Sequence, residues 1–214
     1  MDNTEIRFQN VTKSKTFKNL IETFKLDKKT VLDIGCSYGE FLINFGPRSL
    51  GLTIIKREVE IGKNRGLNIK YGNIESDDLI LHGESFDVIF ANNIFEHLFS
   101  PHKFLIKVRK YLKPNGILIL GVPCIPKIVS LLRFRKFQGS LYPLHINFFT
   151  KETLIKTVES GGYKILTTRG FHFKNKFLDK LIDPIYPHLY IIAKFDPTFQ
   201  YNERRMEELR AYKL

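Results

Sequence analysis

Short apolar runs alternate with amphipathic stretches along most of the chain. Seven runs have the length and the apolar character of strands buried in a sheet; they cover residues 30–34, 50–54, 67–71, 86–91, 117–122, 163–170 and 190–195. Apolar side chains recur at helical spacing over residues 14–26, 39–45, 58–64, 101–112 and 150–159. This order of elements predicts an α/β protein whose mostly parallel sheet is covered by helices on both faces.

Two stretches interrupt the alternation. Residues 123–149 combine prolines, a basic amphipathic run and several aromatics. A loop this long in a compact domain usually has a function, so we predict a lid or insertion that contacts the substrate. The alternative is an amphipathic helix whose apolar side chains (Ile128, Leu131 and Leu132) pack on the sheet. The second stretch, residues 171–188, is rich in Phe, Lys and Pro.

The length of 214 residues is most simply one domain spanning residues 1–214. Within it we expect a helical segment over residues 1–28 and a charged, helix-prone tail over residues 199–214. No repeat and no inter-domain linker is visible.

Composition narrows the class of protein. An apolar fraction of 43% with 13% aromatics is typical of a globular chain, and no apolar run reaches the length of a membrane span. The polar start and the two cysteines predict a reduced, cytoplasmic setting. The net charge of +12 permits a nucleic-acid partner. We do not favour one, because lysines are scattered over most of the predicted helices and the only dense basic cluster lies at residues 133–136.

The stretch Val31–Gly39 carries the strongest chemical signal. An apolar strand ends at Asp33, and Gly35 and Gly39 then bracket a tight turn. Glycine lets bare backbone approach a ligand, and the acidic side chain offers an acceptor to amine or hydroxyl groups. The nicotinamide fingerprint and the phosphate loop are both excluded, because the required glycines and the required lysine are missing.

The loop Asp-x-Gly-x-x-x-Gly resembles that of the class I S-adenosylmethionine-dependent methyltransferases, of the branch that acts on small molecules and glycans. The resemblance covers residues 30–195. Its other parts follow in the family's order: Phe86–Ile89, Glu96–Leu98, Leu112–Gly116, Val122–Pro123, His145–Thr150 and Gly161–Tyr163.

This resemblance implies a Rossmann-like, seven-stranded sheet of order 3-2-1-4-5-7-6 with the last strand antiparallel. In such sheets ligands bind beyond the carboxyl ends of the strands, where the order reverses. The implied cofactor is S-adenosyl-L-methionine. The residues implied to hold it are Asp33, Gly35, Cys36, Ser37, Gly39, Thr53, Ile54, Asn73, Ile74 and Asn92.

Two positions depart from the family pattern. The second strand commonly ends in an acidic residue that grips both ribose hydroxyls, and here that residue is Thr53. Replacing a charged by a neutral hydrogen bond costs about 1–2 kcal/mol of cofactor affinity. Asn73 stands where an Asp often receives the adenine amine, and its carbonyl oxygen can still accept.

His97 and His145 are the candidate catalytic bases, because a base is needed when the methyl acceptor is a hydroxyl or a protonated amine. Each also has a structural alternative: His97, with Glu96, as a helix brace and His145 as an anchor for its loop. Candidate substrate contacts are Asn93, Arg133, Arg135 and Tyr142. We predict no metal, because Asn93 replaces the first carboxylate of the Glu-x-x-Glu-His metal motif that some quinone-pathway relatives carry.

We therefore expect methyl transfer from S-adenosylmethionine to an oxygen or nitrogen of a small molecule or glycan. The alternatives are an RNA methyltransferase and a non-catalytic binding subunit that keeps the fold. Methylation of DNA bases is disfavoured, because no Asp/Asn-Pro-Pro-Tyr follows the fourth strand. The acceptor and the oligomeric state stay open.

Overall fold

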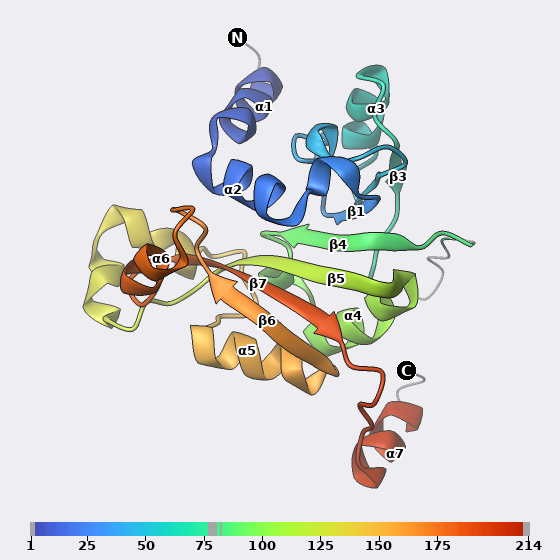
Figure 1. Ribbon diagram of the computed structural model, residues 1–214, viewed down its shortest axis with the longest axis vertical. Coiled ribbons are helices and arrows are strands. Elements are labelled where there is room, and N and C mark those ends of the chain that lie inside the picture. Colours follow the sequence, from blue (N-terminus) through green and yellow to red (C-terminus); the bar gives the residue numbers. More distant parts are fainter. Residues whose placement is uncertain (1–2, 77–80, 82, 212–214) are drawn as a thin grey trace.

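A central seven-stranded sheet organises the computed structural model, which describes residues 3–76, 81 and 83–211 (Figure 1). Its strands are β1 (Val31–Ile34), β2 (Leu50–Thr53), β3 (Ile69–Tyr71), β4 (Phe86–Asn92), β5 (Leu112–Pro123), β6 (Tyr163–Arg169) and β7 (His188–Phe195). They lie in the order β3-β2-β1-β4-β5-β7-β6. The pairs from β3 to β5 are parallel, and β7 runs antiparallel to both of its neighbours. The predicted sheet order is thus confirmed.

Helices cover both faces of this sheet (Figure 1). They are α1 (Asn3–Lys13), α2 (Lys15–Phe24), α3 (Lys56–Asn64), α4 (Pro101–Val108), α5 (Lys151–Ser160), α6 (Lys176–Ile182) and α7 (Glu203–Ala211). None of the helices in the described ranges has the length and apolarity needed to cross a bilayer.

The hydrophobic core lies on both faces of the sheet, because alternate side chains of a strand point to opposite faces. In β1, Leu32 and Ile34 belong to the cluster that packs with α4 and α5. Val31 belongs to the other cluster, where it lies with Phe17 and Leu20 of α2. The short strand β1 is buried along its whole length, so its carboxyl end is held rigidly at the centre of the sheet.

The predicted helix over residues 39–45 is wrong, because the structure has only a 3₁₀ turn at Leu42–Asn44. Gly39 has a φ of 90°, and the sequence Gly46-Pro47 follows a few residues later. So few residues do not nucleate an α-helix, and the proline moves its predecessor out of the helical region. Phe41 and Phe45 still pack against the core, which explains their helix-like spacing.

Other boundaries also differ from the predictions. The helix expected over residues 101–112 ends at Val108, and β5 begins at Leu112 rather than at residue 117. Ser14 separates α1 from α2, because its hydroxyl accepts the Phe17 N–H and caps α2. Residues 171–188 contain the unpredicted helix α6.

The irregular segment 123–149 contains no α-helix. It forms two 3₁₀ turns, Val129–Arg133 and Arg135–Leu141. Ile128 is exposed, so the alternative of a helix packed on the sheet through this side chain does not hold.

Candidate active site

The bend after β1 holds a buried acid. The side chain of Asp33 is 2% exposed, and its Oδ2 has no hydrogen-bond partner among the described residues. Burial, and then the nearby Glu40, raise the pKa of this carboxyl. The backbone N–H groups of Gly35 and Cys36 both donate to the Leu52 carbonyl, at 2.9 and 3.0 Å, which ties the bend to β2.

The two glycines of the bend are required by its shape. Gly35 and Gly39 have φ values of 74° and 90°, a region that residues with a Cβ rarely adopt. A Cβ at Gly39 would also lie 2.6 Å from the Leu67 side chain. Cys36 plays a different part, because its thiol is buried in a small core cluster and burial raises its pKa.

Thr53 lies at the carboxyl end of β2 and is bound to a carboxylate from the next helix. Its Oγ1 donates to Glu58 Oε2 at 2.5 Å, and the Ser37 hydroxyl donates to Glu58 Oε1 at 3.0 Å. Glu58 thus joins two residues that were predicted to hold the cofactor. The prediction missed it, although an acid in the first turn of a helix is a recognisable signal.

The remaining predicted cofactor residues lie at the same edge of the sheet in different surroundings. Ile54 is exposed and Ile74 is buried. Asn73 already uses its Oδ1 to accept the Glu75 N–H at 2.9 Å. Asn92 ends β4, and its Oδ1 is buried with no partner among the described residues. Two acceptor oxygens, one from Asp33 and one from Asn92, are therefore left free at the ends of adjacent strands.

Helix α1 is fastened to this bend. Arg7 Nε donates to Glu40 Oε1 at 2.7 Å, and Arg7 Nη2 donates to the Ser37 hydroxyl at 3.2 Å. The guanidinium also lies 5.3 Å from the centre of the Tyr38 ring. The bend consequently has an N-terminal cover that was not predicted, because these contacts span thirty or more residues of sequence.

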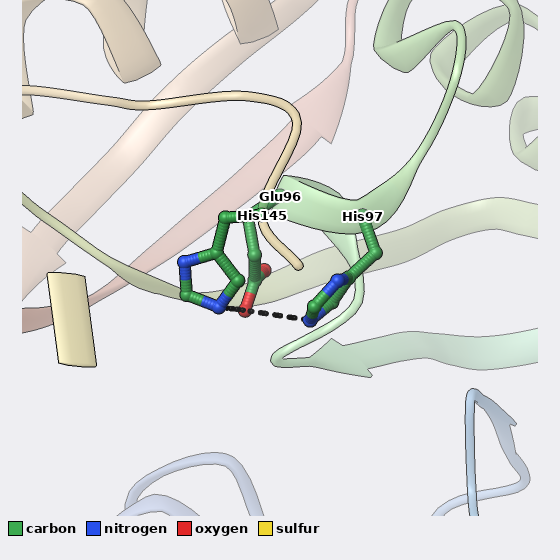
Figure 2. Close-up of side chains that lie close together, drawn as sticks. All are labelled: Glu96, His97 and His145. Carbon is green, nitrogen blue, oxygen red and sulfur yellow. Dashed lines mark ion pairs between the residues drawn. The ribbon is translucent and has the colours of Figure 1, made fainter. Parts of the chain in front are cut away.

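A second cluster lies just past β4, where Glu96 meets two histidines (Figure 2). Glu96 comes from a 3₁₀ helix at Phe95–His97 rather than from the expected α-helix. Its side chain is 1% exposed, neither carboxylate oxygen has a hydrogen-bond partner among the described residues, and burial raises its pKa to about 7. Glu96 Oε1 lies 3.8 Å from His145 Nε2 and 3.9 Å from His97 Nε2.

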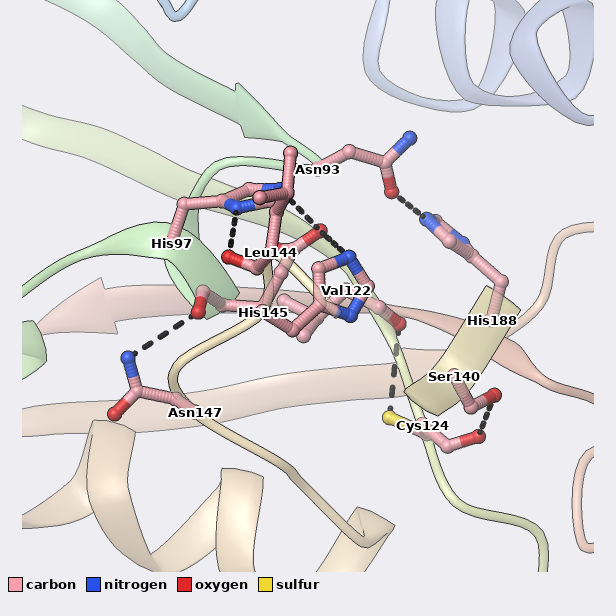
Figure 3. A network of polar contacts seen from close by, with 10 residues as sticks. Asn93, His97, Val122, Cys124, Ser140, Leu144, His145, Asn147 and His188 are labelled. Atoms are coloured by element: carbon pink, nitrogen blue, oxygen red, sulfur yellow. Dashed lines mark hydrogen bonds and ion pairs between the residues drawn. The ribbon is translucent and has the colours of Figure 1, made fainter. Parts of the chain in front are cut away.

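Backbone contacts hold this cluster together (Figure 3). The Glu96 carbonyl accepts the N–H groups of Ile146 and Asn147, at 3.1 and 3.0 Å. His97 Nδ1 lies 3.1 Å from the Leu144 carbonyl. Because a carbonyl only accepts, the proton of a neutral His97 sits on Nδ1, and its Nε2 is left bare toward Glu96.

A cleft of about 360 Å³ opens beside this cluster. Its lining includes Asn93, Glu96, His97, Tyr142, His145 and His188. The structure thus brings both candidate bases together with two predicted substrate contacts. Arg133 and Arg135 are exposed and are not among the lining residues, whereas the neighbouring Lys136 is. His188 was missed; its Nε2 lies 2.8 Å from Asn93 Oδ1.

The cluster of Glu96, His97 and His145 offers a set of metal ligands that the expectation of no bound metal did not consider. Donor atoms of Glu96, His97 and His145 lie within 4.8 Å of one another, close enough to hold a cation. The prediction considered only the missing carboxylate at Asn93 and did not place His145 beside Glu96. One carboxylate and two imidazoles suit a transition-metal ion better than Mg²⁺. That no metal is bound stays a prediction.

Several known proteins are similar to this chain in sequence. A family model described as "Methyltransferase domain" matches residues 8–168. A ubiquinone biosynthesis O-methyltransferase from Roseobacter denitrificans is 32% identical over 156 residues, which cover 67% of this chain and 63% of that enzyme. An uncharacterized protein from Methanocaldococcus jannaschii is 26% identical over 167 residues, which cover 77% of this chain and 79% of that protein.

Solved structures share the fold. An S-adenosylmethionine-dependent methyltransferase from Clostridium acetobutylicum matches with a TM-score of 0.67 and 14% identity, over 90% of this chain and 98% of that one. A possible histamine N-methyltransferase from Thermotoga maritima matches with a TM-score of 0.62 and 19% identity, over 89% and 92%. The chain therefore belongs to the methyltransferase-domain family, within the superfamily of class I S-adenosylmethionine-dependent methyltransferases.

Proposed function

We propose that this protein transfers a methyl group from S-adenosylmethionine to an oxygen or nitrogen of a small molecule or glycan. The observation that carries the proposal is the unpartnered, buried carboxylate oxygen of Asp33 at a glycine bend. A buried polar atom without a partner is costly and calls for a ligand. S-adenosylmethionine has an ammonium group and ribose hydroxyls that donate hydrogen bonds, together with a positively charged sulfur.

The charges around the bend support a cationic ligand. Burial, and then the nearby Asp33, Glu58 and Glu40, raise the pKa of the Cys36 thiol, so all three acids lie close to this side chain. This acidic group is local, since the chain as a whole carries a net charge of +12. Arg7 offsets part of the charge by pairing with Glu40. Asp33 and Glu58 are left as acceptors for the cofactor.

The cleft next to the bend would hold the acceptor. When bound, the cofactor supplies a methyl group already activated on sulfur, so the chain's main task is alignment. His145 is suited to take the acceptor's proton, because burial and the neighbouring His97 lower its pKa and so favour the neutral imidazole. Glu96, 3.8 Å from His145 Nε2, would then stabilise the protonated imidazole.

Titration calorimetry with S-adenosylmethionine and S-adenosylhomocysteine tests the proposal directly. We expect saturable binding of both compounds to the unmodified chain. An absence of binding at millimolar ligand would instead favour a non-catalytic subunit that has kept the fold.

Glu58 should supply the ribose acceptor that Thr53 lacks. In nucleotide-binding sheets a carboxylate near the end of the second strand receives the ribose hydroxyls. Glu58→Gln keeps the shape and removes the charge, so we expect its affinity for S-adenosylhomocysteine to fall about tenfold. Calorimetry measures this loss. Glu60→Gln, an exposed change on the same helix, is the matched control.

A deoxyribose analogue separates this role from a structural one. In the unmodified chain, loss of the ribose hydroxyl should weaken binding about as much as Glu58→Gln does. In the Glu58→Gln variant the same loss should make little further difference. If Glu58→Gln weakens the binding of both ligands equally, Glu58 braces the bend and does not contact the ribose.

A further inference from the structure

Exposed apolar side chains gather at one end of the molecule. We call this surface the apolar cap and define it as residues 128–148 with residues 173–185. Its exposed large hydrophobic side chains are Ile128, Val129, Phe134, Leu141, Tyr142, Leu144, Ile146, Phe148, Phe173, Phe177, Leu178, Leu181 and Ile185. Soluble monomers rarely leave so many adjacent apolar groups uncovered, so this surface indicates an interaction site.

The two segments of the cap lie side by side, although twenty-four residues separate them in sequence (Figure 1). The Lys127 N–H donates to the Pro184 carbonyl at 2.9 Å. The Lys136 ammonium lies 5.2 Å from the centre of the Tyr186 ring. The 3₁₀ turns of residues 129–141 and helix α6 therefore form one continuous surface.

The charge on this surface is almost entirely positive. Residues 97–151 contain no Asp or Glu. The acids of the second segment, Asp179 and Asp183, are buried, where Asp179 accepts the Phe173 N–H and Asp183 accepts the Gly170 N–H. Basic side chains on and beside the cap are exposed instead: Lys127, Arg133, Arg135, Lys136, Lys174, Lys176 and Lys180. Two of them pair with exposed acids at the border of the cap, Lys127 with Glu152 and Lys174 with Glu22.

We propose that the apolar cap docks on the surface of an anionic lipid bilayer. Aliphatic and aromatic side chains would enter the boundary between headgroups and acyl chains, and the surrounding Lys and Arg would contact anionic headgroups. RNA fits this surface less well, because eight of its thirteen exposed apolar side chains are aliphatic and offer bases no ring to stack on. A second copy of the chain fits less well too, since it would bring equal positive charge.

Vesicle sedimentation tests this proposal independently of catalysis. The full chain should sediment with vesicles of phosphatidylcholine mixed with phosphatidylglycerol. It should sediment far less with phosphatidylcholine alone, and salt should release it. The double variant Phe177→Glu and Leu181→Glu should reduce sedimentation by about tenfold or more, because it removes two side chains from the apolar contact and adds repulsion. Both side chains are already exposed, at 69% and 76%, so the fold should persist.

Phe99→Glu is the matched control, because Phe99 is 90% exposed and lies outside the cap. It should sediment like the unmodified chain. Three results would overturn the proposal: no sedimentation with anionic vesicles, sedimentation that the double variant leaves unchanged, or a dimer or RNA complex that the double variant disrupts while vesicles are not bound.

Discussion

Asp33→Ala should lower the affinity for S-adenosylmethionine by about 10- to 100-fold, the cost of losing a hydrogen bond to a buried charge. The unfolding temperature without ligand should not fall, because burial raises the pKa of this carboxyl and so makes its ionised form unfavourable in the folded state. Calorimetry measures the first effect and thermal unfolding the second.

Lower affinity together with an unchanged unfolding temperature would identify Asp33 as a ligand-binding residue rather than a structural one. Asp27→Ala is the control, since Asp27 is exposed and lies one turn before β1. Equal affinity in Asp33→Ala and the unmodified chain would show that the bend does not receive the cofactor. A lowered unfolding temperature would show that the carboxylate supports the fold.

Glu96→Gln should stabilise the folded chain at high pH while removing activity. Burial raises the pKa of Glu96 from 4.5 to about 7. An acid whose pKa is higher in the folded state holds a proton that the unfolded chain releases. Glu96 therefore lowers the free energy of unfolding by an amount that grows between pH 4.5 and about 7 and is constant above that. A shift of this size corresponds to up to about 3 kcal/mol of unfolding free energy.

Denaturant unfolding at about pH 5 and about pH 9, with a chelator in all samples, measures this difference. We expect little gain at the lower pH and most of the gain at the higher. Methyl transfer should fall about 10²- to 10⁴-fold, the usual contribution of acid–base groups. Glu203→Gln, an exposed change on α7, should alter neither quantity. A variant less stable than the unmodified chain at high pH would refute the interpretation that the buried Glu96 carboxylate destabilises the fold.

Local patterns accounted for much of the fold. The strands and the glycine bend depend on neighbouring residues, and the sheet order came from the resemblance of the motifs to a known family. The error at residues 39–45 has a local cause as well. Phe41 and Phe45 have helical spacing, but Gly39 before them and Gly46-Pro47 after them leave too few residues for an α-helix, and only a 3₁₀ turn forms.

Contacts that join distant segments were harder to predict. Glu58 reaches back twenty-one residues to Ser37, and Arg7 reaches forward thirty-three residues to Glu40. Neither pair follows a short motif, so periodicity and spacing do not reveal it. Thr53, taken alone, indicated a weakened cofactor site. The structure places Glu58 against it, and Glu58 is the ribose acceptor that we propose in place of the missing acid.

The amino-acid sequence alone determined the α/β class, the bend at Asp33 and the two histidines that are candidate bases, because each of these depends on residues close in sequence. Only the tertiary structure decided that His145 meets Glu96, and that residues 128–148 and 173–185 share one apolar surface. The physical reason is that packing and backbone hydrogen bonds between distant segments set these distances, as where the Glu96 carbonyl holds the loop that carries His145.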